Sequence, residues 1–385
     1  MKVKMFLACA LCSFALASCI QDEALNSEAA IDQCTGNNVQ SATISWEDRT
    51  VDLYLSVKTD LSNLDLEFTI PQGATLEENG EPKAKVLTVD RTHSVVSGTF
   101  DFSAESATGE HVRTFTVISE DGTQKPVYTV RALRAELPLK FDFENIAPNN
   151  AFDILTQGPT FQWASGNPGF QLTGMANSPV DYPTLRWRSG FQGNCVKLVT
   201  CNTGSFGAMV KMYIAAGNLF VGRFDLANAL TNAPKATKFG FAFYKKPLRL
   251  TGYYKYKAGS EYSEKGQVVS GKKDTGDIYA ILYEADKDAY MIDGEWETTP
   301  AQKSTFVALA RMQDAGGPGT PEADEWTPFS LDFAPYEGRT IDEQKLINGG
   351  YKLAIVFSSS LKGAMFEGAL GSTLYIDEVE IKCED

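Results

Sequence analysis

Histidine is the scarcest catalytic residue in this sequence, which has only two in 385 residues. Zinc sites and acid–base catalysts often rely on histidine, so both are hard to build here. Basic residues are also in the minority: 35 Lys and Arg stand against 49 Asp and Glu, for a net charge of −14. No basic run interrupts this balance, and we therefore expect no nucleic-acid partner.

Long hydrophobic runs are missing after the start of the chain. The apolar run at residues 5–17 follows Lys2 and Lys4 and is too short to span a membrane. It ends in Leu16-Ala17-Ser18-Cys19, which resembles the lipobox of bacterial lipoproteins. The resemblance implies a signal peptide at 1–18, cleavage before Cys19 and lipidation of Cys19. We therefore expect a protein that acyl chains anchor to a membrane.

An acidic pair, Asp22-Glu23, follows the predicted lipidation site. It resembles the surface-export signal of Bacteroidetes lipoproteins, and this resemblance implies an outer-membrane protein that faces the cell exterior. The alternative is that the pair simply belongs to a solvated tether. Residues 19–40 are rich in Asn, Ser, Asp and Gly, and this composition predicts a flexible tether.

Disulfide bonds and cysteine metal sites find little support in the sequence. Of seven cysteines, Cys9 and Cys12 leave with the signal peptide and Cys19 takes the lipid. If Cys195 and Cys201 lie on one strand, the six residues span about 20 Å, which is too far for a disulfide. The four cysteines that remain, Cys34, Cys195, Cys201 and Cys383, show no Cys-x-x-Cys spacing, so we expect free thiols and no cysteine or histidine metal site.

Long amphipathic helical patterns are also missing, and only residues 341–347 indicate a helix. Short alternating runs rich in Phe and Tyr, separated by Gly-containing turns, take their place. Seven such runs at 41–135 predict an immunoglobulin-like sandwich that acts as a spacer. The strand-rich residues 136–385 predict a larger antiparallel jelly roll, so the expected fold class is all-β.

Two parts of the chain resemble known families. The hairpin at 114–130 turns at Asp121-Gly122 and is similar to the last hairpin of bacterial immunoglobulin-like surface modules. The stretches GNLFVG (217–222), KFGF (238–241), PLRLTGYYKY (247–256) and GSTLYIDEV (371–379) resemble the putative carbohydrate metabolism domain of Bacteroidetes surface proteins. This resemblance covers most of 141–382 and implies a carbohydrate-binding jelly roll. It supplies no catalytic residues.

Two aromatic residues are candidates for glycan contacts, because a flat ring stacks on the C–H face of a sugar. Tyr253 alternates with Tyr254 and is predicted to be exposed; the alternative is a tyrosine that caps a solvated strand. Trp296 lies in the loop at 293–300 and is also predicted to be exposed, which makes it the strongest single candidate.

The strand expected at 277–284 is apolar on both faces, which favours a place in mid-sheet with one face towards a concavity. Tyr279 and Tyr283 are predicted to line that groove. Arg311 is predicted to join them, with Asp277 as an acceptor for its buried charge. The alternative is that the tyrosines fill a large core.

Several carboxylates lie near these residues, namely Asp274, Asp277, Glu295 and Glu297. A glycosidase needs two carboxylates about 5–5.5 Å or about 6.5–9.5 Å apart. The sequence gives no reason to choose a pair, and the acidic surface of an acidic protein accounts for them equally well. An enzyme is therefore the less favoured interpretation.

Asp377 shares a face with the apolar residue Val379, so its carboxylate needs a partner. Carbohydrate-binding jelly rolls with an N-terminal Phe-Glu and a C-terminal Asp-Glu-Val look similar. That resemblance implies a structural calcium ion held by Glu144 and Asp377. The alternative is that backbone amides or a lysine satisfy Asp377, and no other cofactor is expected.

These observations predict a lipid-anchored outer-membrane protein whose jelly roll binds a glycan by aromatic stacking and polar clamping. Other outer-membrane proteins of glycan utilisation are expected as partners. Two alternatives stay open. One is a glycoside hydrolase or lyase that uses a carboxylate pair, and the other is a non-catalytic adhesin or structural surface protein.

Overall fold

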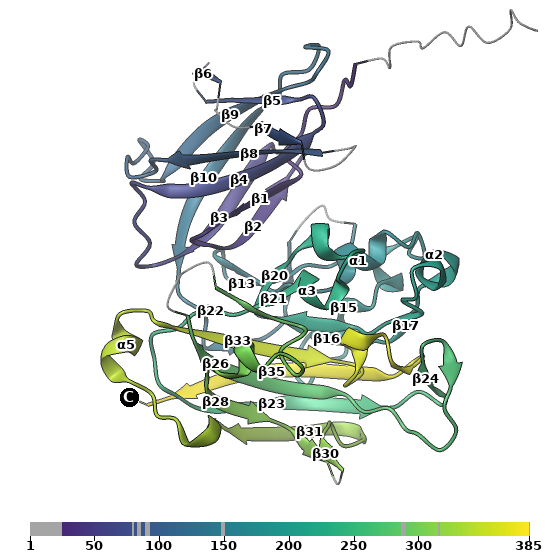
Figure 1. Cartoon of the computed structure of the whole chain (residues 1–385). Coiled ribbons are helices and arrows are strands. Elements are labelled where there is room, and N and C mark those ends of the chain that lie inside the picture. The colour runs from purple at the N-terminus through teal and green to yellow at the C-terminus, as the bar shows by residue number, and fades with distance from the viewer. Residues whose placement is uncertain are drawn as a thin grey trace, which may run out of the picture.

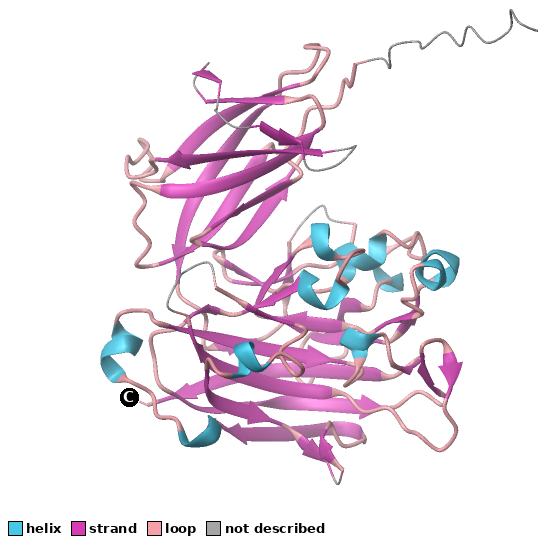
Figure 2. Cartoon of the chain, in the orientation of Figure 1, coloured by secondary structure: helices cyan, strands magenta, loops and turns pink. Residues whose placement is uncertain are grey.

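The computed structural model describes residues 25–78, 81–82, 86–88, 93–147, 151–285, 290–314 and 316–384. The predicted signal peptide 1–18, the predicted lipidation site Cys19 and the Asp22-Glu23 pair lie outside these residues. Strands dominate the described parts, and the helices there have at most six residues (Figure 2). The all-β fold class is therefore confirmed. None of the described helices is long and apolar enough to cross a membrane.

The N-terminal sandwich has strands β1 (Gln33–Gly36), β2 (Val39–Ser45), β3 (Thr50–Ser56), β4 (Leu64–Pro71), β5 (Thr75–Glu78), β6 (Glu81–Pro82), β7 (Val86–Thr88), β8 (His93–Phe100), β9 (Val112–Ile118) and β10 (Val127–Ala135). One sheet has the order β1-β4-β8-β7 and the other β2-β3-β10-β9-β5-β6 (Figure 1). The ring contacts of Phe68, Phe100 and Phe115 join the two sheets in a shared core. The arrangement is the immunoglobulin-like sandwich that the alternating pattern predicts.

The predicted hairpin is confirmed, because β9 and β10 pair antiparallel with Thr116 opposite Val127. Its turn contains Gly122 at φ 69°, a left-handed conformation that glycine adopts without a steric penalty. Asp121 supports the turn by accepting hydrogen bonds from Ser119 Oγ and from the backbone N–H of Thr123.

The tether prediction for 19–40 is wrong at its C-terminal end, since β1 and the start of β2 lie within it. Strand β1 pairs with β4, with Cys34 opposite Phe68. Ile31 and Cys34 are both buried in the first core. A four-residue strand among polar neighbours carries too few apolar positions to show an alternating pattern.

The C-terminal domain has two principal sheets. Its strands are β11 (Lys140–Phe141), β12 (Asn145–Ile146), β13 (Leu155–Gln157), β14 (Phe161–Gln162), β15 (Thr184–Trp187), β16 (Cys195–Val199), β17 (Cys201–Asn202), β18 (Ile214–Ala215), β19 (Asn218–Phe220), β20 (Gly222–Phe224), β21 (Thr237–Phe239), β22 (Phe241–Ala242), β23 (Pro247–Lys257), β24 (Tyr262–Glu264), β25 (Gln267–Val268), β26 (Asp277–Glu284), β27 (Ile292–Asp293), β28 (Phe306–Arg311), β29 (Gln313–Asp314), β30 (Gly317–Pro318), β31 (Ala323–Asp332), β32 (Ala334–Pro335), β33 (Tyr351–Ser358), β34 (Gly368–Ala369) and β35 (Thr373–Cys383). One principal sheet has the order β15-β16-β35-β23-β31, with β11 on β35. The other has the order β19-β33-β26-β28-β32, with β22 on β33.

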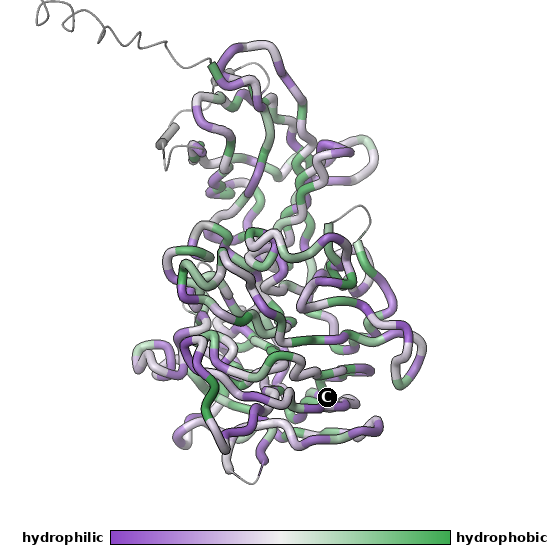
Figure 3. Tube along the Cα trace, turned by 90° about the vertical axis from the view of Figure 1, so that its right-hand side faces the viewer, coloured by the Kyte–Doolittle hydropathy of each residue, from purple (hydrophilic) through white to green (hydrophobic). Residues whose placement is uncertain are grey.

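These two sheets enclose the main core and form the expected antiparallel jelly roll. Their strand pairs are antiparallel. Hydrophobic and hydrophilic residues alternate along much of the chain (Figure 3). Leu198 and Ile376 from the first sheet pack in one cluster with Ile278 and Ile355 from the second. Burial of such side chains is the main stabilising contribution to a sandwich of this kind.

Strand β26 is buried on both faces, as its apolar sequence predicts. Ile278, Ala280 and Leu282 face the main core. Tyr279 and Tyr283 belong to a separate cluster on the outer side, with Trp296. A small sheet of order β20-β21-β27 contributes Phe239 and Ile292 to that outer cluster. The second sheet therefore has a covered outer face, on which a site can be built away from solvent.

Short helices lie among the strands of this domain (Figure 2). They are α1 (Asn167–Gln171), η1 (Pro179–Asp181), α2 (Gly204–Met209), η2 (Leu226–Asn228), α3 (Ala233–Ala236), α4 (Pro300–Lys303), η3 (Tyr336–Gly338), α5 (Glu343–Ile347) and η4 (Gly363–Met365). Helices α1 and α3 gather beside β20 and β21 (Figure 1). The predicted helix at 341–347 is confirmed as α5, which Asp342 caps by accepting from the N–H of Lys345. The other helices have three to six residues and leave no amphipathic pattern in the sequence, so the expectation of a single helix is wrong.

The two sandwiches touch directly. Gln40 Oε1 accepts a hydrogen bond of 2.6 Å from the N–H of Ala242. Tyr244 forms a hydroxyl–hydroxyl hydrogen bond with Ser56, and Lys58 Nζ lies 5.1 Å from the centre of the Tyr244 ring. Strand β10 ends at Ala135 and β11 begins at Lys140, so a short linker and these polar contacts join the two domains.

Candidate functional site

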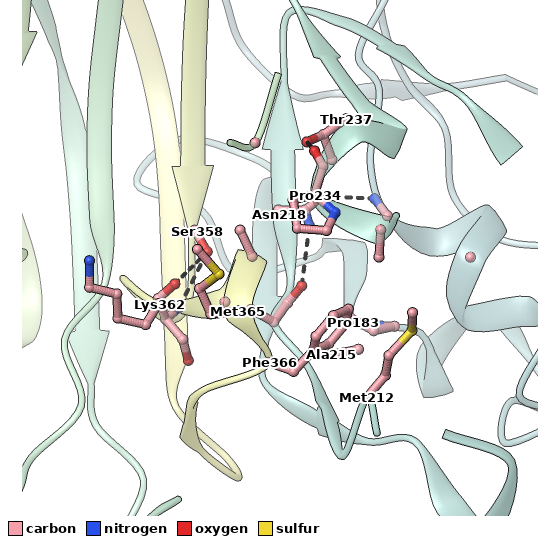
Figure 4. Close-up of a pocket in the computed structure, with 18 of the residues that line it drawn as sticks. Pro183, Met212, Ala215, Asn218, Pro234, Thr237, Ser358, Lys362, Met365 and Phe366 are labelled. Carbon is pink, nitrogen blue, oxygen red and sulfur yellow. Dashed lines mark hydrogen bonds between the residues drawn. The ribbon is translucent and has the colours of Figure 1, made fainter. Parts of the chain in front are cut away.

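A cavity of about 220 Å³ opens on the outer side of the second sheet of the jelly roll (Figure 4). Its walls come from β26, β28 and β33, from the short helices α1, α2 and α3, and from the segment around η4. Most of the lining side chains are apolar or aromatic, and a few polar groups lie among them. This composition is typical of small-ligand sites in proteins.

Four charged residues form one end of the cavity, and we call them the charge cluster: Asp277, Glu297, Arg311 and Lys362. Arg311 Nε and Nη2 donate to the two carboxylate oxygens of Asp277, at 3.0 and 2.6 Å. Arg311 Nη1 lies 2.7 Å from Glu297 Oε1. Lys362 Nζ donates to Glu297 Oε2 at 3.1 Å. Two positive and two negative charges thus neutralise one another.

Burial differs along the charge cluster. The side chains of Arg311 and Asp277 are 8% and 5% exposed, whereas those of Glu297 and Lys362 are 32% and 47% exposed. The guanidinium carbon of Arg311 also lies 5.3 Å from the ring centres of both Tyr279 and Trp296. Arg311 is therefore fixed from several sides, while Glu297 and Lys362 remain accessible to a ligand.

The two carboxylates of the cluster have opposite pKa shifts. Burial raises the pKa of Asp277, although the neighbouring Arg311 acts in the opposite direction. Burial also acts to raise the pKa of Glu297, but the charges and hydrogen bonds of Arg311 and Lys362 outweigh it and lower that pKa. Glu297 is therefore a stable anion and a strong hydrogen-bond acceptor at the cavity.

Trp296 is buried, contrary to the prediction of an exposed ring, because the segment after β27 folds over the outer face of β26. The residue is 6% exposed, and its Nε1 donates a hydrogen bond of 3.1 Å to Tyr279 Oη. Its ring also packs against Phe306 at 5.4 Å. Trp296 nevertheless lines the cavity together with Tyr279 and Arg311, so the fold brings three of the sequence candidates together.

Tyr283 does not belong to this site, contrary to the groove prediction. Its ring is fully buried in the outer cluster, and its hydroxyl donates to the carbonyl of Phe239 at 2.7 Å. Gly240, at φ 118°, makes room for that hydroxyl, since a Cβ there would lie 2.2 Å from it. Packing, the alternative named from the sequence, is what the structure shows for Tyr283.

Tyr253 lies on the other principal sheet, on β23, apart from the cavity residues. Its ring stacks on Phe191 with centroids 3.7 Å apart and planes 9° from parallel. The prediction of an open ring is therefore wrong for one of its faces. The loop after β15 carries Phe191, and nothing in the strand pattern around Tyr253 indicates that this loop folds back.

Of the four acidic residues named from the sequence, only Asp277 and Glu297 line the cavity. Asp274 accepts hydrogen bonds from Ser360 Oγ and Ser372 Oγ, and so holds the segment that contains η4. Glu295 pairs with Lys235 at 3.6 Å. Nothing in the sequence indicates that Lys362 lines the cavity, because its position depends on the fold of the turn after β33.

Glu144 and Asp377, the predicted calcium ligands, both hold the loop between β15 and β16. Glu144 Oε1 accepts from the N–H of Asn194 at 2.8 Å. Asp377 accepts from the N–H groups of Gln192 and Glu378, at 2.9 and 2.8 Å. Asp377 is thus satisfied by backbone amides, the alternative named from the sequence. Among the described residues, no three His, Cys, Asp or Glu side chains gather to hold a metal, and calcium stays a prediction.

Comparison with known proteins agrees with this architecture. A putative glycoside hydrolase from Bacteroides thetaiotaomicron is 39% identical, with a TM-score of 0.75 over 95% of this chain and 99% of that one. A putative glycoside hydrolase from Bacteroides vulgatus is 46% identical, with a TM-score of 0.59 over 64% of this chain and 98% of that one.

No curated protein matches the chain. The sequence profile of the putative carbohydrate metabolism domain matches residues 142–382, which include every residue of the charge cluster. The resemblance seen in the sequence is therefore confirmed, and the chain belongs to the putative carbohydrate metabolism domain family.

Proposed function

We propose that this protein binds a glycan in the cavity of its C-terminal jelly roll and captures it at the outer surface of the cell. The observation that carries the proposal is the charge cluster beside Trp296 and Tyr279, inside the domain that matches a carbohydrate-related family. Sugar hydroxyls both donate and accept hydrogen bonds, so a site for them needs groups of both kinds.

Glu297 and Lys362 supply those two kinds of group. The Glu297 carboxylate accepts from sugar hydroxyls, and the Lys362 ammonium donates to sugar oxygens. Both are partly exposed, while the deeper Asp277–Arg311 pair fixes the Glu297 carboxylate in place. Asn218 Oδ1 accepts from the N–H of Gly166 at 2.7 Å and thereby orients an amide at the cavity wall.

A glycoside hydrolase is the second candidate, and the relatives named above carry that description. The observation in its favour is the pair of carboxylates with opposite pKa shifts, Asp277 and Glu297, on either side of Arg311. Both oxygens of Asp277 already accept from Arg311, however, which suits an anchor better than a proton donor. We therefore favour binding without chemistry.

A glycan-array screen tests the proposal. The probe is the soluble chain from Ile20 onward, applied with calcium and again with a chelator. We expect binding to one glycan class, and loss of binding with the chelator alone would support the predicted calcium ion. Chromatography of each bound glycan before and after incubation separates the two candidates, because a hydrolase shortens it. Absence of binding to plant, host and microbial glycans under both conditions would contradict the proposal and favour an adhesive role.

The surface location follows from the sequence signals at Cys19 and Asp22-Glu23, and it has its own test. We expect the full chain to incorporate labelled fatty acid and to be cleaved when protease is added to intact cells. Cys19→Ala removes the acyl acceptor and should abolish the label. Labelled protein that resists external protease would place it on the periplasmic side instead.

A further inference from the structure

The cavity is asymmetric: its charged groups lie at one end and apolar side chains form much of the rest. Phe206, Met212, Phe224, Leu230, Met365 and Phe366 are among the apolar lining residues. Figure 4 shows Met212, Pro183 and Phe366 together on one side, with Lys362 on the opposite side. A ligand that fills the whole cavity therefore meets two different environments.

Part of the apolar lining is open to solvent. Leu230 and Met365 are 47% and 45% exposed, although both line the cavity. Single exposed apolar residues are common on proteins, but these two border a hollow that is itself apolar. An apolar ligand group placed there removes both side chains from water, which is favourable.

The backbone of Phe366, in the apolar wall of the cavity, is strained. It has φ 57° and ψ 35°, the left-handed region that a bulky side chain rarely adopts. The N–H of Phe366 donates to the carbonyl of Gly363, and that of Met365 to Lys362, which hold the turn. Strained backbone of this kind clusters at ligand sites, where the surrounding structure maintains it.

The charged end limits what can bind. Its four members pair among themselves, so a ligand gains there only by hydrogen bonding to the accessible Glu297 and Lys362. A plain sugar that filled the remaining volume would place hydroxyls against Phe206, Met212 and Phe366, whose side chains carry no hydrogen-bond donor and at most a weak thioether acceptor. Unsatisfied buried hydroxyls oppose binding.

We infer that the ligand of this cavity is a glycan or glycoside that carries an apolar substituent, such as an acyl or aryl group. The sugar lies at the charge cluster and the substituent lies against the apolar wall. This inference rests on the proposed function, since it names the class of carbohydrate that the same site takes.

Alkyl glycosides of increasing chain length test the inference. The probes are methyl, butyl and hexyl β-glycosides of glucose, galactose, mannose and xylose, with hexanol as the sugar-free control, measured by isothermal titration calorimetry on the soluble chain. For a sugar that binds, we expect Kd to fall roughly fourfold for each methylene that enters the cavity.

The possible results separate the two claims. A sugar that binds with the same Kd at every chain length overturns the inference and leaves the proposed function standing. Hexanol that binds as tightly as the hexyl glycosides shows that the sugar contributes nothing, and overturns both. Absence of binding by every glycoside, the hexyl ones included, overturns the inference, and the glycan array then decides the proposed function separately.

A matched pair of variants on α2 locates the substituent. Phe206 lines the cavity and is partly exposed, so Phe206→Ser should fold and should remove most of the chain-length dependence while methyl glycosides bind as before. Met209 lies on the same helix outside the cavity lining and is 72% exposed, so Met209→Ser should leave every Kd unchanged. Equal chain-length dependence in both variants would contradict the assigned position.

Discussion

At the scale of single residues, Arg311 determines the polar end of the cavity. It holds two carboxylates by hydrogen bonds and lies against two aromatic rings, which leaves it almost no freedom to move. A buried arginine needs acceptors, and this requirement already points to Asp277 from the sequence. The second acceptor, Glu297, is one of many acidic residues until the fold places it beside Arg311.

Removal of the deep acceptor should destabilise the protein. Asp277→Ala leaves Arg311 with Glu297 alone, and we expect the free energy of unfolding to fall by about 3 kcal/mol. Asp332→Ala is the matched control, because Asp332 pairs with Arg249 at the surface and should change stability by less than about 1 kcal/mol. Urea denaturation of both variants measures the difference, and equal small changes would show that Asp277 is not needed to hold Arg311.

Asp377 should make stability depend on pH. Burial raises the pKa of Asp377 to about 6, above the ordinary value of 3.8. A raised pKa in the folded state means that folding favours the protonated form. The contribution is fully present below pH 3.8 and is lost as the pH rises through about 6.

The test compares wild type with Asp377→Asn by urea denaturation between pH 4 and pH 7. We expect the stability of the wild type relative to the variant to decline over this range, because only the wild type loses a proton there. A difference that stays constant with pH would contradict the raised pKa of Asp377.

At the scale of elements, two strands matter most, and the sequence predicts only one of them. Strand β26 is apolar on both faces, so its place in mid-sheet with a covered outer face can be read from its residues. Strand β1 has only four residues. It contributes to stability through buried side chains, and no alternating pattern in its sequence indicates that burial.

Ile31 should therefore matter to stability, although it lies in the segment predicted to be a tether. It is fully buried against the first core, and Ile31→Ala should lower the free energy of unfolding of the N-terminal domain by about 2–5 kcal/mol. Leu25, 59% exposed, provides the control, and Leu25→Ala should have little effect. Equal small effects in both variants would restore the tether interpretation.

The loops explain why the candidate site could be predicted only in part. The sequence alone identifies Trp296, Tyr279 and Arg311 as candidate site residues, by their residue types and their places in the expected loop and strands. The burial of Trp296 and the stacking of Phe191 on Tyr253 depend on loops that fold back over sheets, which strand periodicity does not report. Lys362 and Phe366 lie in the turn after β33. The path of this turn depends on a hydrogen bond from Ser360 Oγ to Asp274, which lies 86 positions earlier in the chain.

At the scale of the whole molecule, an immunoglobulin-like sandwich packs directly on a jelly roll. The polar contacts of Gln40, Ser56 and Lys58 with the second domain fix the two domains to each other. With a lipid at Cys19, this arrangement would hold the cavity away from the membrane, as a spacer domain should. The net charge of −14 gives no general attraction to anionic polymers.

The most direct measurement of the central claim is calorimetric titration of the best glycan from the array into two pairs of variants. Glu297→Gln and Lys362→Met remove the accessible charges of the cavity. Glu384→Gln and Lys246→Met remove a surface Lys–Glu pair outside the cavity lining. We expect the first pair to weaken binding by at least about tenfold each, as loss of a charged hydrogen bond does, and the second pair to bind like wild type. Glycan binding that is unchanged in all four variants would contradict the assignment of the site to this cavity.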